Sequence, residues 1–283
     1  MYRGRLAPSP TGLLHLGHAR TFWTAQERCV ERRGVLVLRN EDLDRSRCRR
    51  EFIEAMIEDL HWFGITWREG PDIGGPCAPY SQSECVDDYE TVFRQLAEHG
   101  WIYPCTCSRQ DVARAAQAPN LGDEEPIYPG TCRPGSPRSF SWAEVQSLRD
   151  RGAHWRFRVP EAESVEFGDG CFGPQKSQAG LDFGDFVVWR NDWIPAYQLA
   201  VVVDDARMSI SEVVRGADLL TSTARQILLY RALGANIPKF YHCPLVRDSA
   251  GVRLAKRHNS LSLRALRKSG LRPEEIREGS WCP

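Results

Sequence analysis

Residues 8–18 have the sequence PSPTGLLHLGH, which lies between a predicted strand and a predicted helix. The strand is the short stretch 5–7, and the helix covers 18–33, where apolar side chains recur on one face until a glycine ends the pattern. Residues 35–38, VLVL, form a continuous apolar run typical of a strand buried on both faces. Strand, turn, helix and strand predict a βαβ unit, whose ligand site lies at the carboxyl ends of the strands.

The turn between these elements has the chemistry of a nucleotide site. Gly17 lacks a Cβ atom, so a flat base can lie against the backbone there. The start of the helix is expected to offer free N–H groups and its positive dipole end to phosphate. His15 and His18 add donors that can meet charge developing on a phosphoryl group. An isolated HxGH tetrapeptide can also be two histidines in a turn and helix cap, but the strand and helix around it favour the nucleotide site.

Composition narrows the class of protein further. The 283 residues allow one or two compact domains, and 37 Lys and Arg balance 37 Asp and Glu, so the formal net charge is +0. This balance excludes a uniformly basic nucleic-acid binder but not a neutral protein with a local basic face. No apolar run approaches the roughly 20 residues of a membrane helix, and no apolar stretch follows the N-terminus as in a signal peptide. We therefore expect a cytoplasmic protein that makes no membrane contact.

The same patterns predict the remaining elements. Helices are expected at 52–63, 86–99 and 219–233, strands at 154–159, 165–172, 186–189 and 208–214, and a C-terminal helix and short tail at 263–268 and 273–277. The apolar segment 197–203 is compatible with a helix or a strand. Residues 104–137 break the alternation, because they are rich in Pro, Gly and Cys and have poor periodicity. We interpret this segment as an insertion built around a metal.

Three of the ten cysteines lie in that insertion. Cys105 and Cys107 form the only close pair in the sequence, and Cys132 follows them. In a reducing compartment such a cluster indicates a metal before a disulfide. Thiolates suit zinc in a closed structural site, and a loop with free thiols is the alternative.

At this point the chain resembles a known family. PSPTGxxHxGH is similar to the HIGH signature of class I aminoacyl-tRNA synthetases in its glutamyl form, and AYQLAVVVDD at 196–205 and VRGADL at 214–219 resemble the glutamate-site segments of the same enzymes. The Tyr-Gln pair and the short C-terminus are more similar to the glutamyl-queuosine tRNA(Asp) synthetases, paralogues without an anticodon-binding domain. The resemblance covers residues 3 to about 260.

The resemblance implies a glutamate pocket. Arg5 and Arg215 would hold the two carboxylates of glutamate, Ser9 and Tyr197 would supply hydroxyls, and Glu41 would take the ammonium group. A guanidinium fork suits a carboxylate bidentately, which a lysine would not do. A surface arginine is the alternative reading of Arg5, since most arginines are exposed.

Glu41 also follows from its position, because it lies at the carboxyl end of the second predicted strand. Asp42 and Asp44 lie so near that the sequence by itself does not choose among the three carboxylates. Only the resemblance selects Glu41.

Class I enzymes carry a second signature, KMSKS, on a loop whose lysines stabilise the leaving pyrophosphate. The equivalent here is RLAKR at 253–257, in which Lys256 matches the second lysine. Arg253 replaces the first lysine and Ala255 replaces the serine, so we expect a working but slower activation step. A solvated basic segment is the alternative.

The resemblance also implies a zinc site of four ligands, Cys105, Cys107, Tyr128 and Cys132. The catalytic residues would be His15, His18 and Lys256, and the ATP site would add Gly17. ATP would be bound with Mg²⁺, and zinc would be structural.

Together these features predict an α/β fold of Rossmann-like (HUP-type) topology, a parallel sheet with helices on both faces. A small zinc-containing subdomain is inserted, and a short helical C-terminus follows. The expected division is 1–104 and 138–237 for the catalytic halves, the latter with an acceptor-type insert, 105–137 for the zinc insert, and 238–283 for the pyrophosphate loop and C-terminal helix.

The expected activity is ATP-dependent activation of L-glutamate to glutamyl-adenylate without tRNA, followed by transfer to queuosine in tRNA(Asp), by a monomer. Two alternatives share many residues: a truncated glutamyl-tRNA synthetase that charges the tRNA 3′ end, and a non-catalytic tRNA- or ATP-binding paralogue. A small-molecule nucleotidyltransferase would share the HxGH motif but would not explain Tyr197, Arg215 or the cysteines.

Overall fold

The structure of the chain is a computed structural model that describes residues 1–115, 126–246 and 262–278. The expected pyrophosphate loop, with Arg253, Ala255 and Lys256, lies outside the described residues. Among the helices that the structure describes, we find none with both the length and the apolar character needed to span a bilayer.

The first βαβ unit is confirmed. Strand β1 (Arg3–Leu6) leads through the 8–15 turn into α1 (Leu16–Glu31), and β2 (Val35–Leu38) returns parallel to β1. Gly34 makes this return possible, because a Cβ atom there would lie 2.4 Å from the Tyr2 ring. The buried side chains of β2 pack in the interior, as its uninterrupted apolar sequence predicts.

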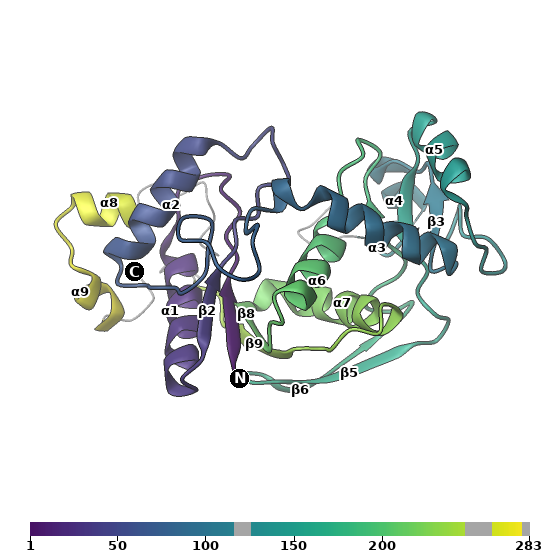
Figure 1. Cartoon of the computed structure of the whole chain (residues 1–283). Helices are drawn as coiled ribbons and strands as arrows, with labels where there is room; N and C mark the ends of the chain where they lie inside the picture. Colours follow the sequence, from purple (N-terminus) through teal and green to yellow (C-terminus); the bar gives the residue numbers. More distant parts are fainter. Residues whose placement is uncertain (116–125, 247–261, 279–283) are drawn as a thin grey trace.

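The second half of the chain adds strands beside the first. Strands β8 (Glu212–Gly216) and β9 (Lys239–Cys243) are parallel to each other, with α7 (Leu220–Ala232) between them in sequence. The backbone N–H of Ser211, just before β8, donates to the Arg3 carbonyl at 2.9 Å, so β8 lies next to β1. In Figure 1, α1 lies on one side of these strands, and α7 and α6 (Tyr197–Arg207) lie on the other. The carboxyl ends of β1, β2 and β8 therefore meet at one edge.

The α/β class is confirmed, but the sheets are mixed. Strands β3 (Ile102–Cys105), β4 (His154–Phe157) and β7 (Phe186–Trp189) form an antiparallel sheet, and β5 (Ser164–Asp169) and β6 (Gly173–Gln178) form an antiparallel hairpin. A single β5–β9 pair, Asp169 with Phe240, joins the hairpin to the parallel strands. The expected strand at 208–214 begins only at Glu212, because α6 continues to Arg207. Segment 197–203, left open by the sequence, is helical.

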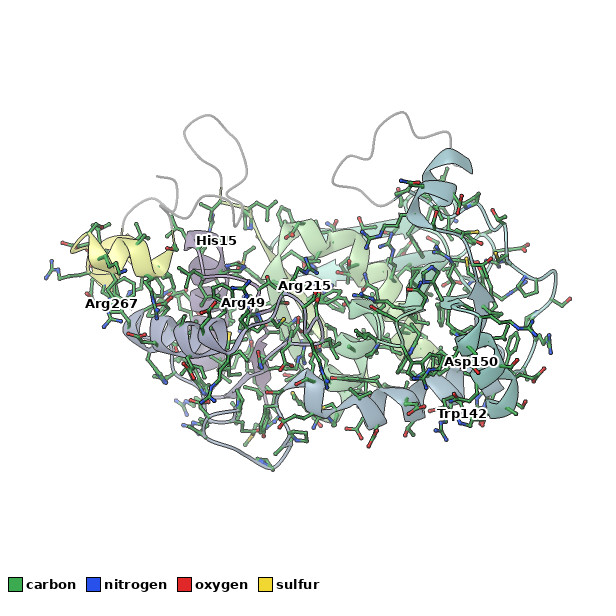
Figure 2. All side chains as sticks on the ribbon, turned by 90° about the horizontal axis from the view of Figure 1, so that it is seen from above. His15, Arg49, Trp142, Asp150, Arg215 and Arg267 are labelled. Carbon is green, nitrogen blue, oxygen red and sulfur yellow. The ribbon has the colours of Figure 1, made fainter. Side chains whose placement is uncertain are left out.

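The rest of the regular structure among the described residues is helical. It consists of α2 (Arg50–Trp62), α3 (Val86–Glu98), α4 (Arg109–Ala115), α5 (Trp142–Asp150), α8 (Leu263–Lys268), α9 (Pro273–Glu278) and the short 3₁₀ turns Gln82–Glu84 and Ala217–Leu219. Seen from above, His15 lies toward α8, Arg215 lies in the middle of the molecule, and Trp142 and Asp150 of α5 lie at the far end (Figure 2).

The core has two main apolar clusters. One surrounds the antiparallel sheet, where Phe93 meets Trp155 edge-on with ring centroids 5.3 Å apart, a favoured aromatic geometry. The other joins α1, α2 and α8 to β1 and β2. Both clusters include side chains of the parallel strands, such as Val213 in the first and Val214 in the second.

Candidate active site

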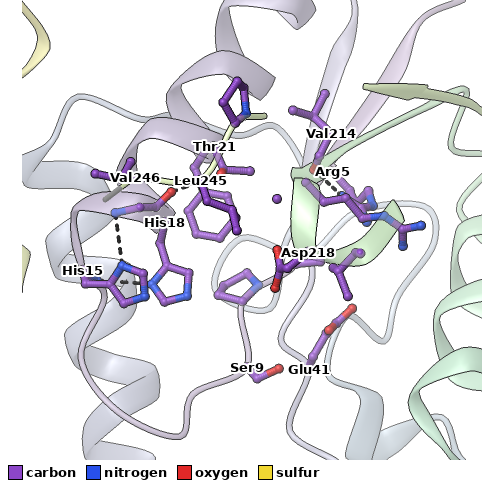
Figure 3. Close-up of a pocket in the computed structure, with 18 of the residues that line it drawn as sticks. Arg5, Ser9, His15, His18, Thr21, Glu41, Val214, Asp218, Leu245 and Val246 are labelled. Atoms are coloured by element: carbon purple, nitrogen blue, oxygen red, sulfur yellow. Dashed lines mark hydrogen bonds between the residues drawn. The ribbon is translucent and has the colours of Figure 1, made fainter. Parts of the chain in front are cut away.

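A cavity of about 350 Å³ opens at the carboxyl ends of β1, β2 and β8. Its walls include every described residue that the sequence assigned to glutamate or ATP: Arg5, Ser9, His15, Gly17, His18, Glu41, Tyr197 and Arg215. In Figure 3, His15 and His18 lie on one side of the cavity, and Arg5 and Glu41 lie on the other. The ninth residue, Lys256, is outside the described residues.

The two histidines form a reciprocal cap at the start of α1. Nδ1 of His15 accepts from the backbone N–H of Gly17 at 3.1 Å, and Nδ1 of His18 accepts from the backbone N–H of His15 at 3.2 Å. Because both Nδ1 atoms accept, a neutral ring at either position carries its proton on Nε2. The cap therefore fixes the tautomer of both rings and makes Nε2–H the donor in a cavity that both rings line.

This cap changes one expectation. The start of the helix was expected to offer free N–H groups to phosphate, but the N–H groups of Gly17 and His18 donate to Nδ1 and to the carbonyl of His15. The expectation is wrong, because His15 satisfies these groups as the N-cap. Gly17 has a packing reason as well, since a Cβ there would lie 3.0 Å from Cε1 of the His15 ring.

Behind the opposite wall lies a network of buried charges centred on Arg39, which the sequence analysis did not single out. Arg39 donates to Asp205 at 2.6 Å and to Glu41 at 3.0 Å, and its Nε lies 3.6 Å from Asp204. Burial opposes the charge of Arg39, but the three carboxylates together hold its pKa well above the usual range. Arg5 joins the network through Asp205, at 3.5 Å, and donates to the carbonyl of Val214 at 2.8 Å.

The structure separates the three neighbouring carboxylates that the sequence could not. Glu41 lines the cavity, and burial raises its pKa against the opposing effect of Arg39. Asp42 accepts from the backbone and hydroxyl of Ser83. Asp44 accepts from Ser46 and Arg47 at the surface. Of the three, Glu41 is the one in the cavity wall.

Arg215 is held differently from the other buried arginines. It donates to Nε2 of His242 at 3.1 Å, to Gln226 at 2.8 Å and to Thr223 at 2.8 Å. All three acceptors are neutral groups, and no ion pair joins Arg215 to a carboxylate in the part of the chain that the structure describes. Burial lowers the pKa of Arg215, and a hydrogen bond with Tyr197 opposes this effect. The cavity wall thus carries a buried positive charge without a directly bound anion.

A second, larger space of about 1130 Å³ adjoins the cavity. Ser9, Glu41 and Tyr197 line both spaces, and the second one extends to Cys107 and Tyr128. The side of the cavity that carries Glu41 and Tyr197 therefore opens toward the cysteine segment.

The four residues of the expected zinc site lie together. Sγ of Cys107 is 3.5 Å from Sγ of Cys132, and the Tyr128 hydroxyl lies 3.4 Å from Sγ of Cys105 and 3.7 Å from Sγ of Cys107. The three sulfur atoms lie within 4.8 Å of one another. Tetrahedral zinc with Zn–S bonds of about 2.3 Å needs sulfur separations of about 3.8 Å, so the donor set fits that ion.

The surroundings act differently on two of the cysteines: burial raises the pKa of Cys107 to about 11, whereas Cys132 is shifted toward the thiolate. Nε of Arg156 donates to Cys105 at 3.3 Å, and its guanidinium lies 3.9 Å from the centre of the Tyr128 ring. Burial opposes ionisation of Cys132, but the backbone N–H of Thr106 and the neighbouring Tyr128 lower its pKa to about 7. Thiolates are the form in which cysteine binds a metal.

Sequence reasoning missed two groups near the cavity. Asp218, which Figure 3 shows between the histidine side and the Glu41 side, belongs to a quoted motif but had no role assigned to it. His242 and Asp169 lie behind Arg215 and were not considered. His242 carries one sequence signal, a polar residue in a largely apolar strand, whereas Asp169 ends the partly exposed strand β5 and carries no such signal.

The fold and the site together define a class of protein. The model of "tRNA synthetases class I (E and Q), catalytic domain" matches residues 1–280, and the chain belongs to this family. The family resemblance inferred from the motifs is confirmed.

Two curated relatives narrow the comparison. The chain is 49% identical to the Glutamyl-Q tRNA(Asp) synthetase of Nitratidesulfovibrio vulgaris, over 96% of this chain and 82% of that protein. It is 47% identical to the Glutamyl-Q tRNA(Asp) synthetase of Symbiobacterium thermophilum, over 98% of this chain and 84% of that protein.

A solved structure supports the assignment to the family. The crystal structure of a glutamate tRNA ligase from Elizabethkingia meningosepticum, in complex with its amino acid, matches with a TM-score of 0.77 and 30% identity. The match covers 95% of this chain and 53% of that one, so this chain spans about half the length of the ligase.

Proposed function

We propose that the protein activates L-glutamate with ATP, forming glutamyl-adenylate without tRNA, and then transfers glutamate to queuosine in tRNA(Asp). One observation carries the proposal: a single cavity brings the two capped histidines together with Glu41 and Arg215. The names of two similar curated relatives support the choice of amino acid and acceptor.

In this proposal the side of the cavity with Arg5, Glu41, Tyr197 and Arg215 binds glutamate. Arg215 offers a buried guanidinium to a carboxylate, which is the anion that its fork fits best. Glu41 takes the ammonium group, and Ser9 and Tyr197 supply hydroxyls.

The His15–His18 side binds ATP as its magnesium complex. An α-carboxylate oxygen of glutamate attacks the α-phosphorus, a new P–O bond forms, and the bond to the leaving pyrophosphate breaks. The Nε2–H groups of His15 and His18 are fixed as donors before the reaction, so they can meet phosphoryl charge without reorganisation. Lys256 would meet the leaving pyrophosphate. The carboxylate is already a nucleophile, so positioning and electrostatics carry the step.

The cysteine cluster would hold zinc through Cys105, Cys107, Cys132 and Tyr128. When bound, zinc would cross-link this segment, which has little apolar side chain of its own. We also propose that the chain is divided into four parts, 1–104, 105–137, 138–237 and 238–283.

The test begins with glutamate-dependent exchange of pyrophosphate into ATP, measured without RNA and across all amino acids. Exchange with glutamate alone is expected, and a His15→Ala, His18→Ala double variant is the matched inactive control. Labelled glutamate is then offered to tRNA(Asp) with and without queuosine. Label on the queuosine nucleotide supports the proposal, whereas label only at the 3′ end of tRNA(Glu) would identify a glutamyl-tRNA synthetase. Absence of exchange, with ATP still bound, would identify a non-catalytic paralogue.

A further inference from the structure

One side chain separates the buried guanidinium of Arg215 from a buried carboxylate. Nδ1 of His242 lies 2.6 Å from Oδ2 of Asp169, and Nε2 of the same ring accepts from Nε of Arg215 at 3.1 Å. All three side chains are buried. The groups form a line of carboxylate, imidazole and guanidinium that ends at the cavity.

Asp169 must be an acceptor at every contact the structure gives it. The backbone N–H groups of Cys171 and Phe172 donate to Oδ1 at 3.0 and 2.9 Å, and the backbone N–H of His242 donates to Oδ2 at 3.1 Å. Burial opposes its charge, but these donors hold the pKa of Asp169 below its usual value. Nδ1 of His242 is therefore the protonated nitrogen, which leaves Nε2 as an acceptor that faces both Arg215 and the Thr223 hydroxyl, each at 3.1 Å.

We propose that Asp169 and His242 are positioning residues for Arg215, which keep its guanidinium oriented and its charge available for a carboxylate of the substrate. The inference rests on the proposed function in taking that substrate to be glutamate.

The spacing of the three groups is the physical reason. A carboxylate bonded directly to Arg215 would occupy the fork, as Asp205 does with Arg39 at 2.6 Å. With the neutral imidazole between them, Asp169 supports the cation from a distance and leaves the cavity side of the guanidinium to a ligand. Thr223 and Gln226 accept the other N–H groups on the same principle, as neutral oxygens that fix the plane without neutralising it.

An Asp169→Asn variant tests the line with almost no change in shape. In this variant an NH2 group replaces one carboxylate oxygen. In the place of Oδ1 the NH2 group would face two fixed backbone donors, and in the place of Oδ2 it would face one backbone donor and the imidazole. We expect the second arrangement, because it brings fewer donors against one another. His242 would then accept at Nδ1 and carry its proton on Nε2, facing the N–H of Arg215. A clash between buried donors costs a factor of about 5 to 150 in binding, so the KM for glutamate in pyrophosphate exchange should rise at least about fivefold. The KM for ATP should stay within about twofold.

A glutamine at position 242 separates positioning from folding. In His242→Gln the side-chain oxygen can replace Nε2 as acceptor, and glutamine has no tautomers. We expect this variant to keep a KM for glutamate near that of the wild type, and Asp169→Asn added to it should raise the KM far less than it does beside histidine. Asp72→Asn is the matched control, because Asp72 also faces a histidine, His61, at 4.0 Å but lies outside the cavity lining.

Ring nitrogen NMR reads the tautomer without any activity. With His242 assigned by its loss in His242→Gln, the wild type should show a protonated Nδ1, and Asp169→Asn a protonated Nε2. Wild-type exchange with an unchanged glutamate KM in Asp169→Asn would overturn the inference, as would a wild-type ring protonated at Nε2. An equal KM increase in both backgrounds would make Asp169 merely structural. Absence of glutamate-dependent exchange in the wild type would instead refute the proposed function, while the NMR result would still stand.

Discussion

Replacing Arg39 with glutamine removes the cation that holds three buried carboxylates together. Arg39 donates to Asp205 and Glu41 and approaches Asp204, and its side chain is completely buried. Glutamine is neutral and cannot reach three groups at once. The variant therefore leaves negative charges in the interior with one positive charge fewer.

The size of the effect follows from what each carboxylate keeps. Asp204 retains its bonds from Gln82 at 2.8 Å, Tyr89 at 2.9 Å and Arg207 at 3.3 Å. Among the described side chains, Asp205 keeps Arg5 and Tyr230, at 3.5 and 3.4 Å. Breaking a buried ion pair costs about 3–5 kcal/mol, and the partners that remain place this case near the lower end, at about 3 kcal/mol. With an unfolding entropy of about 2.1 cal/mol/K per residue, that loss lowers the Tm of a chain of this size by about 5 °C.

Urea denaturation at pH 7 and pH 5 measures this loss. Burial raises the pKa of Glu41, and the variant removes the opposing effect of Arg39, so the penalty of the charged Glu41 is present above its folded pKa and is relieved as the pH falls. The difference between wild type and Arg39→Gln should therefore narrow at pH 5. Arg50→Gln is the control, since Arg50 pairs with Glu54 in solvent and its loss should not register. A variant within about 1 kcal/mol of wild type, or a difference that widens at pH 5, would refute the reasoning.

Three further changes probe the site and its surroundings. Arg215→Lys removes a fork that makes three bonds and should raise the KM for glutamate in pyrophosphate exchange by about tenfold or more, with the KM for ATP unchanged; an equal rise in both would contradict it. Burial lowers the pKa of His242 to about 4. As the pH falls from about 6.5 to about 4, the unfolded chain therefore binds a proton that the folded chain does not, and the free energy of unfolding decreases by up to about 3 kcal/mol. The free energy of unfolding of His242→Gln should decrease less over this pH range than that of the wild type. An equal decrease in both would show that His242 is not the titrating group. Cys107→Ser should lose zinc, measured by atomic absorption, whereas Cys29→Ser should retain it; full zinc content in Cys107→Ser would exclude the cluster as the metal site.

The sequence could predict those parts of the fold and site that depend on local pattern. Residues 5–38 contain the complete βαβ signal, and the side chains at its turn lie in the cavity because the carboxyl ends of parallel strands share an edge. The antiparallel pairing of β3 with β4 could not be predicted in this way. Ile102 pairs with Phe157 across more than 50 residues, and strand periodicity carries no information about the partner.

The Asp169–His242–Arg215 line was hidden for the same reason. Asp169 lies in a segment whose glycines indicate a turn, and His242 lies on another strand, 73 residues later. Only the pairing of β5 with β9 at Phe240 brings them together. The Arg39 network is a similar case. The two aspartates at 204 and 205 follow an apolar run and were visible, but the cation they face directly follows β2, in the other half of the chain.

The buried arginines around the cavity are graded by the anions they already hold. Arg39 faces three carboxylates, Arg5 shares one of them at 3.5 Å, and Arg215 holds none directly among the described residues. A buried cation that is bonded only to neutral acceptors keeps part of its desolvation penalty, and an incoming anion can offset that part. This penalty remains at Arg215, on the cavity wall, and is removed at Arg39, which lies behind the wall. The charge of Arg215 lowers the stability of the protein without ligand. Because a ligand that binds only the folded state stabilises it, binding of a carboxylate at Arg215 should raise the free energy of unfolding.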